Sequence, residues 1–228
     1  MKFLKIKILF TLLISFQVTL AQEKDSISML LNSYTSLDTL RSKQLINASN
    51  YFTYNNPERA LEYINEGLNI AKKKHWKNGV ALAINQKGTI YYTMADNLKA
   101  LDFYLEALRV SEQINNQTLT INVYNNLANI YADMKNFDKA LANYNNCLKI
   151  ANQQNDTINS IRAFNNIGNV YSETNSVDTS LIYFDKALFL AKEQENAFFV
   201  AAIINNKGLA YKRKNDYKNS LKYYTEAL

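Results

Sequence analysis

The chain has 228 residues and a formal net charge of +6 at pH 7, and 47% of its residues are hydrophobic, which is enough apolar material for a stable fold. Five glycines and one proline are too few breakers for a many-stranded β protein, so the composition favours long helices joined by short loops. One histidine and one cysteine cannot supply the usual zinc ligand sets, and a single cysteine excludes an internal disulfide.

Residues 1–21 are predicted to be a secretory signal peptide. Three lysines precede an apolar run over residues 8–20, and small residues surround a cleavage point after Ala21. The run is shorter than the roughly 20 residues that span a bilayer, so an uncleaved membrane anchor is the weaker interpretation. We therefore expect a protein of the periplasm or cell envelope, with membrane association only through an uncleaved N-terminus or a region downstream.

Cleavage would remove three lysines and no acid, so the net charge would fall from +6 to +3. Basic stripes interleaved with aromatic residues are not evident in the remaining sequence. We therefore expect no nucleic acid to bind to this segment. Residues 22–40 follow as a separate N-terminal segment, with a short helix expected near residues 27–34.

From residue 41 the sequence repeats with a period of 40. A small residue followed three positions later by tyrosine recurs at this spacing, and so does Ala or Ser followed by Leu. The first series is Gly88 and Tyr91, Ala128 and Tyr131, Gly168 and Tyr171, Gly208 and Tyr211, and the second is Ala100-Leu101, Ala140-Leu141, Ser180-Leu181 and Ser220-Leu221. Such a pattern predicts one supersecondary unit built several times and stacked. The array is expected over residues 41–228, as units 41–80, 81–120, 121–160, 161–200 and an incomplete 201–228.

Each unit is predicted to be a pair of helices of about four turns joined by a short loop. In the third unit one apolar stripe contains Ile121, Tyr124 and Ala128, and a second stripe begins at Ala140. Preferred N-cap residues precede the helices. They are Asn56, Asp96, Asn136, Ser176 and Asp216 for the second helices, and Asn116, Asp156 and Asn196 for three of the first helices. Pro57 directly follows one cap, at a position where a proline starts a helix.

Some single positions carry further expectations. The small residues at 88, 128, 168 and 208 are expected where two helices approach closely. Cys147 stands where other units have Ala or Gly, so it is interpreted as a small core residue rather than a reactive thiol. Lys87 and Lys207 replace the apolar residue of the other units, and we expect them to mark less tightly packed outer units.

The repeated residues resemble the tetratricopeptide repeat, whose first helix carries Trp-x-x-Leu-Gly-x-x-Tyr and whose second carries Ala-x-x-x-Phe. Phe164 to Tyr171 matches the first pattern, and Ala140 with Tyr144 matches the second. The resemblance covers residues 41–228 and implies an all-α, right-handed superhelical solenoid of tandem helix-turn-helix repeats. A 40-residue period also suits repeats of the HEAT type, but those lack this signature.

The sequence departs from that family in two ways. The period is 40 rather than 34, and the proline that normally ends each unit is absent, so the second helices are expected to run longer. A signal peptide followed by 40-residue units resembles the exported N-terminal regions of bacterial sensor histidine kinases and LuxR-type regulators. Since the last unit stops within its second helix, we expect a fragment of a longer protein.

The sequence offers no constellation for catalysis. His75 has no evident nucleophile or acid partner, and no glycine-rich phosphate loop is present. We therefore expect neither enzymatic activity nor a cofactor.

The first helices carry the candidate binding residues. In the family that the chain resembles, this face lines a concave groove, and recurring asparagines there bind the backbone of an extended peptide or protein partner through amide donors and acceptors. The candidates are Asn122, Asn125, Asn126, Asn129, Arg162, Asn165, Asn166, Asn169, Asn205 and Asn206. The alternative is that asparagine, abundant along the whole chain, is merely solvated here. Two functions stay open: a peptide-binding or protein-binding scaffold, and the sensor ectodomain of a signalling protein.

Overall fold

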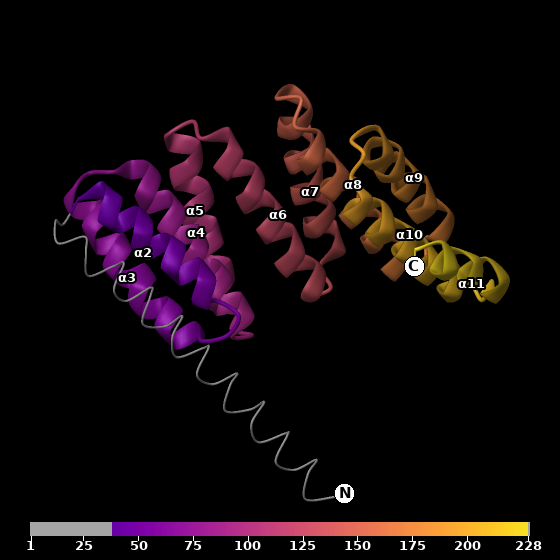
Figure 1. Ribbon diagram of the computed structural model, residues 1–228, viewed down its shortest axis with the longest axis horizontal. Coiled ribbons are helices and arrows are strands. Elements are labelled where there is room, and N and C mark those ends of the chain that lie inside the picture. The colour runs from indigo at the N-terminus through magenta and orange to yellow at the C-terminus, as the bar shows by residue number, and fades with distance from the viewer. Residues whose placement is uncertain (1–37, 228) are drawn as a thin grey trace, which may run out of the picture. The chain divides into compact units, whose positions relative to one another are not determined.

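The structure, a computed structural model, describes residues 38–227. The expected signal peptide and the helix expected near residues 27–34 lie outside the described residues. Every regular element in the described range is an α-helix (Figure 1). The helices are α2 (Thr39–Phe52), α3 (Pro57–Lys73), α4 (Lys77–Thr93), α5 (Asn97–Gln113), α6 (Gln117–Asp133), α7 (Phe137–Gln153), α8 (Thr157–Glu173), α9 (Val177–Glu193), α10 (Ala197–Arg213) and α11 (Tyr217–Glu226). This confirms the expected all-α fold class of tandem helix-turn-helix repeats.

The predicted 40-residue period is present in the helices themselves. First helices begin at Lys77, Gln117, Thr157 and Ala197, which are 40 residues apart. The 40-residue windows defined from the sequence begin four residues inside these helices, so they share the period of the helix pairs but not their starting point. Helices α3 to α10 all contain 17 residues. First and second helices thus have the same length, and the expectation that the second helices are longer than those of 34-residue units stays a prediction.

The equal helix lengths follow from one kind of turn that ends every helix from α3 to α10. Within residues 38–227, eight residues have positive φ between 50° and 61°: His75, Ala95, Asn115, Lys135, Asn155, Asn175, Glu195 and Asn215. At the end of α5, the Asn115 N–H donates to the Glu112 carbonyl and the Asn116 N–H to the Ser111 carbonyl. This is the Schellman arrangement. Because the turn stops each helix without proline, the loop between repeats is as short as the loop within them.

The residue after each left-handed position opens the next helix. The Asn116 side chain, for example, accepts a hydrogen bond from the Leu119 N–H at 3.0 Å. Equivalent bonds confirm the predicted caps Asn56, Asp96, Asn136, Asp156, Asn196 and Asp216. Pro57 lies in the first turn of α3, as predicted. Ser176 is the N-cap of α9, as predicted, but its side chain makes no cap hydrogen bond.

The described chain forms two compact units, divided between Thr93 and Met94. In the first unit, α2 packs against both α3 and α4. Its core contains Ile46, Phe52, Ile64 and Ile90, with Trp76 packed against them. A Cβ on Gly67 would lie 3.2 Å from the Leu45 Cβ, so α3 approaches α2 closely at this glycine.

The second unit contains α5 to α11, and each helix packs against the next one in the sequence. The expected close approach occurs at two of the predicted glycines. A Cβ on Gly168 would lie 2.7 Å from the Phe184 ring, and a Cβ on Gly208 would lie 2.9 Å from the Tyr224 ring. An aromatic side chain of each second helix thus occupies the space that a glycine of the first helix leaves open.

Two single-residue expectations have different outcomes. Cys147 is 1% exposed, which confirms it as a core residue, and burial raises the pKa of its thiol to about 11. Lys207 is also buried rather than loosely packed, so the expectation for it is wrong. Its aliphatic stem lies in the core while its ammonium group reaches Asp185 at 2.6 Å and lies over the Tyr223 ring.

No helix within residues 38–227 combines the length and apolar character that crossing a membrane requires.

Candidate functional site

The candidate residues lie on the first helices of the second unit. Helix α6 contacts α8, and α8 contacts α10. Among the described residues, the second helices α7, α9 and α11 make no comparable contacts with one another. The first helices are therefore drawn together along one side of this unit. We call the side of this unit that α6, α8 and α10 form together the first-helix face.

Four asparagine side chains on this face are joined into one hydrogen-bonded row, which we call the amide row. The Asn166 Nδ2 on α8 donates to the Asn125 Oδ1 on α6 at 3.2 Å. The Asn206 Nδ2 on α10 donates to the Asn165 Oδ1 on α8 at 2.9 Å. A longer bond of 3.5 Å, from the Asn165 Nδ2 to the Asn166 Oδ1, connects these two pairs. The amide row thus crosses three successive repeats.

The amide row lies at the boundary between core and solvent. All four of its residues are partly buried, beside the fully buried Leu127 and Ile167. A buried amide without a partner would be costly, so the side-chain bonds between repeats help these helices to pack. Beside any role in binding, these asparagines connect neighbouring repeats.

The remaining candidates differ in their surroundings. Asn122, Arg162 and Asn205 are exposed. Asn126, Asn129 and Asn169 are partly buried. The Tyr144 hydroxyl on α7 donates to the Asn129 Oδ1 at 2.6 Å, so this asparagine contacts its own repeat partner.

Arg162 links the face to the next repeat. Its guanidinium group donates to the Asn159 Oδ1 at 3.3 Å and lies 5.7 Å from the centre of the Phe199 ring on α10. The structure therefore brings Asn125, Asn165, Asn166 and Asn206 into one row and leaves the other candidates around it.

Sequence reasoning did not predict the side-chain bonds between the asparagines. The signal that indicates them is the adjacent Asn-Asn pair in register on each first helix, at 125–126, 165–166 and 205–206. The second residue of one pair bonds the first residue of the preceding pair, 41 positions earlier.

Charged and phenolic groups elsewhere on the helices also bridge repeats. Lys135 pairs with Glu173 at 2.8 Å, and Arg213 donates to the Ser172 hydroxyl at 3.1 Å. The Tyr124 hydroxyl donates to Glu112 at 3.0 Å, and burial together with this carboxylate raises the pKa of Tyr124 to about 12. These contacts join neighbouring hairpins.

Apart from the Arg162 guanidinium, the chemistry of the face is that of neutral hydrogen bonding. Among the residues that the structure describes, no group of three or more His, Cys, Asp or Glu side chains could hold a metal ion. An amide carries two N–H donors and one oxygen with two lone pairs, so an amide in the row retains bonding capacity after its bonds to neighbouring repeats are made. Such groups suit the N–H and C=O groups of another polypeptide.

The sequence profile of the tetratricopeptide repeat family matches residues 79–153 and 119–193, and a second tetratricopeptide repeat profile matches residues 201–228. These matches cover more than half of the chain, which therefore belongs to the tetratricopeptide repeat family. Tetratricopeptide repeats are generally non-catalytic binding scaffolds. No curated protein matches the chain by sequence.

Solved structures share the fold. The chain is similar to a signal transduction ATPase with a tetratricopeptide repeat sensor from Pyrococcus horikoshii, with TM-score 0.74, 17% identity and coverage of 87% of this chain and 31% of that one. It is similar to the apo form of RapI, with TM-score 0.70, 16% identity and coverage of 86% and 85%. It is also similar to NprR in complex with its cognate peptide NprX, with TM-score 0.64, 17% identity and coverage of 82% and 54%. At these identities the similarity shows the fold alone.

Proposed function

We propose that this chain is a scaffold that binds an extended peptide, or an extended segment of a partner protein, along the first-helix face of α6, α8 and α10. The observation that carries the proposal is the amide row. Its members lie at the edge of the core, cross three repeats in sequence and keep unused donors and lone pairs. The similarity to NprR, which was solved in complex with its cognate peptide, supports the same kind of ligand.

The spacing of the row suits an extended backbone. Packed helices lie about 8–10 Å apart, while an extended chain advances about 3.3 Å per residue. Successive repeats would therefore meet a bound peptide at roughly every third residue. Because amides pair with backbone groups, this recognition would depend little on the ligand's side chains. Arg162 and the exposed Asn122 at the edge of the row would supply the selectivity that the row itself lacks.

The test uses a library of unstructured ten-residue peptides displayed on phage, followed by affinity measurements on the peptides selected. Replacing the row members Asn125, Asn166 and Asn206 together by Ala should weaken binding by one to three decades, at about 0.5–1.5 kcal/mol for each lost hydrogen bond. A matched control replaces Asn145 and Asn146, which are exposed on the second helix α7. Unchanged affinity in the triple variant would reject the proposal.

The triple variant must be separated from a folding effect because Asn166 and Asn206 also bond the preceding repeat. Helix content and urea stability are therefore measured for every variant. Asn122→Ala provides a second comparison because this exposed side chain lies beside the row. A triple variant that unfolds, combined with full binding by Asn122→Ala, would assign the asparagines to structure.

We also propose that the protein is exported. The three lysines, the short apolar run and the small residues before the predicted cleavage point support this location. N-terminal sequencing of the mature protein is the measurement, with a start at Gln22 expected. Membrane-bound protein that still begins at Met1 would indicate an uncleaved anchor instead.

A sensor ectodomain is the second candidate function. It is favoured by the similarity to a signal transduction ATPase whose repeats are described as a sensor. In that case ligand binding to the first-helix face would change the state of an output domain. Sequencing of the coding region downstream is the test, and a membrane helix followed by kinase or DNA-binding motifs would support it.

A further inference from the structure

The turn between α3 and α4 differs in charge from the other turns between repeats. Residues 72–77 read Lys-Lys-Lys-His-Trp-Lys, and we call them the basic turn. No Asp or Glu occurs between Gly67 and Ala95. The equivalent turns of the later repeats each contain at least one acid, and they contain only one lysine among them. Those turns are residues 112–117, 152–157 and 192–197.

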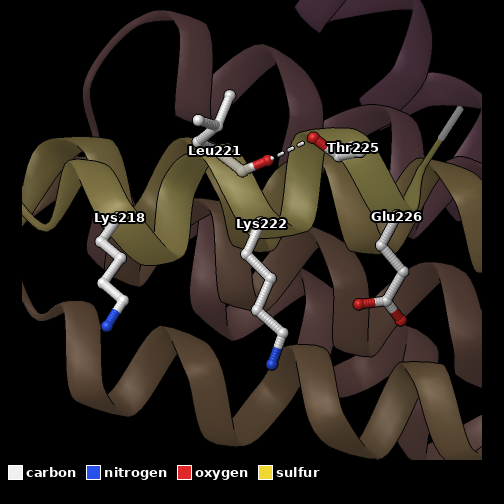
Figure 2. A pocket seen from close by; sticks show the side chains of 5 residues that line it. All are labelled: Lys218, Leu221, Lys222, Thr225 and Glu226. Atoms are coloured by element: carbon white, nitrogen blue, oxygen red, sulfur yellow. Dashed lines mark hydrogen bonds between the residues drawn. The ribbon is translucent and has the colours of Figure 1, made fainter.

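The positive charge of the basic turn is not neutralised by the described residues around it. Its four lysines are exposed, and none of them pairs with a carboxylate within residues 38–227. Glu66, the last acid of α3, is itself paired with Arg41 at 2.7 Å. Lys218 and Lys222 on α11, by contrast, lie in one row with Glu226 (Figure 2). The basic turn is therefore a concentrated cationic patch.

Helix stability does not account for all four lysines. Lys72 and Lys73 lie in the last turn of α3, where a positive charge interacts favourably with the helix dipole. Lys77 is the first residue of α4, where a positive charge is unfavourable. It also adds to the charge of the preceding lysines. The complete cluster thus works against the start of α4 and calls for an explanation outside the fold.

A tryptophan has a fixed position in this patch. A Cβ on Gly79 would lie 2.0 Å from the Trp76 ring, so the indole lies directly on this glycine. The later repeats have Leu119, Asn159 and Phe199 at the position of Gly79, and a side chain there would occupy the place of the ring. The indole packs against the core of the first unit and stays partly exposed. The basic turn therefore presents a held aromatic edge among its ammonium groups.

We propose that the basic turn binds the surface of an anionic phospholipid bilayer. Its lysines would lie at the lipid phosphates, and the exposed edge of Trp76 would lie at the level of the headgroups. Each lysine near an anionic bilayer strengthens binding by about fivefold, and tryptophan favours the boundary between lipid and water. An acidic polypeptide would attract the lysines equally but would offer the indole no apolar layer.

This association needs neither the apolar run of the N-terminus nor a region downstream. It is also separate from peptide binding on the first-helix face, because the basic turn belongs to the first compact unit and that face to the second. Either function can therefore fail in a test without affecting the other.

The test uses the protein purified from cells, whose N-terminus is the same in every variant, and two kinds of vesicle. One contains phosphatidylglycerol and phosphatidylcholine, and the other contains phosphatidylcholine alone. Trp76 is the only tryptophan of the chain, so its fluorescence reports on the basic turn. The anionic vesicles should shift its emission to the blue, and brominated lipid in them should quench it. The neutral vesicles should do neither. Sedimentation with the vesicles gives the affinity, which should fall as salt screens the charges.

Two sets of substitutions separate the basic turn from the net charge. Replacing Lys72, Lys73, Lys74 and Lys77 together by Gln should weaken binding to the anionic vesicles by about two to three decades. The matched control replaces four exposed lysines elsewhere by Gln and should weaken binding by less than about fivefold. These lysines are Lys149, Lys192, Lys218 and Lys222.

Lys77→Glu separates binding from folding. An acid at the start of α4 suits the helix dipole, so this variant should melt at a higher temperature than the unaltered protein and still bind the anionic vesicles more weakly. Circular dichroism confirms the helix content of every variant. A variant that loses stability and binding together would contradict the assigned cost of Lys77.

Several results would overturn the proposal. Equal losses in the two quadruple variants would attribute binding to net charge. Vesicle binding that leaves the fluorescence of Trp76 unchanged would place the contact on another surface. Equal binding to both kinds of vesicle would indicate an uncleaved N-terminal anchor instead. Tighter binding to poly-glutamate than to the anionic vesicles would assign the basic turn to an acidic protein.

Discussion

At the scale of single residues, the left-handed turn position between helices is occupied by asparagine four times, at Asn115, Asn155, Asn175 and Asn215, and never by glycine. Asparagine tolerates positive φ, whereas other side chains are strained there by roughly 1–2 kcal/mol. Glu195, with φ 50°, has this strain. The turns therefore contain local strain that a single substitution can remove.

We predict that Glu195→Gly stabilises the protein by about 0.5–1 kcal/mol, because relief of strain exceeds the entropy that glycine adds to the unfolded chain. Urea unfolding measures the change. Asn115→Gly should give a smaller gain. Glu193→Gly, at the last residue of α9, should instead be destabilising, by less than the roughly 1 kcal/mol that glycine costs in a helix interior. A loss of stability in Glu195→Gly similar to that in Glu193→Gly would contradict the assigned turn geometry.

Cys147 gives a second prediction at this scale. The thiol is buried among Ile121, Ala151 and Ala163, and its pKa is raised to about 11, so thiolate is scarce at pH 8. The folded protein should not react with a disulfide reagent at pH 8, and it should react fully in denaturant. Cys147→Ala should fold normally because Ala107 and Ala187 occupy the same register. Rapid reaction of folded protein would show an accessible thiol.

At the scale of helices, capping distinguishes otherwise equivalent elements. Asn136 accepts a hydrogen bond from the Lys139 N–H at the start of α7, whereas Ser176 makes no such bond at the start of α9. Asn136→Ala should therefore cost about 1 kcal/mol, and Ser176→Ala should cost less than half of that. Ser176→Asp should be stabilising, since aspartate caps the equivalent helices α5 and α11. Equal losses in the two alanine variants, measured by thermal unfolding, would contradict the difference.

The helices, their caps and the glycine contacts were predictable because each depends on residues within one repeat. The 40-residue period identifies the apolar stripe of each of the two helices in a repeat. A glycine at position 168 indicates a close helix crossing even without knowledge of the Phe184 ring that packs on it. The amide row and the position of Lys207 were not predictable in this way. Asn166 bonds a residue 41 positions earlier, and Lys207 reaches Asp185 on the preceding hairpin. Such contacts depend on how one repeat lies on another, and the pattern within a helix does not specify that.

At the scale of the whole chain, stability comes from contacts between neighbours. Within the second unit each helix packs against the helices next to it in sequence, and the further contacts join α6 with α8 and α8 with α10. In such an array stability is close to a sum of repeat terms and neighbour terms. A substitution at the same register position should then have different effects in an internal hairpin and in α10–α11.

The glycine positions test this difference, since Gly168 and Gly208 hold equivalent places 40 residues apart. A Cβ on Gly168 would press on Phe184, which is fully buried and cannot move aside. A Cβ on Gly208 would press on the half-buried Tyr224, which can turn toward solvent. Overpacking costs about 1–3 kcal/mol, and alanine returns about 1 kcal/mol of helix propensity.

Gly168→Ala should therefore destabilise the protein by up to about 2 kcal/mol, while Gly208→Ala should change its stability by less than about 0.5 kcal/mol. Amide hydrogen exchange should locate the effect. Gly168→Ala should speed exchange in α8 and α9 and in the helices beside them, because this hairpin supports neighbours on both sides. Exchange in α2 and α3 should not change. Gly208→Ala should alter exchange in α10 and α11 alone.

Ala128, opposite Tyr144, already has the Cβ, so Ala128→Gly serves as the reverse control and should cost about 1 kcal/mol. If Gly168→Ala and Gly208→Ala cost the same and loosen the same helices, the second unit unfolds as one cooperative body rather than as an array of neighbouring repeats.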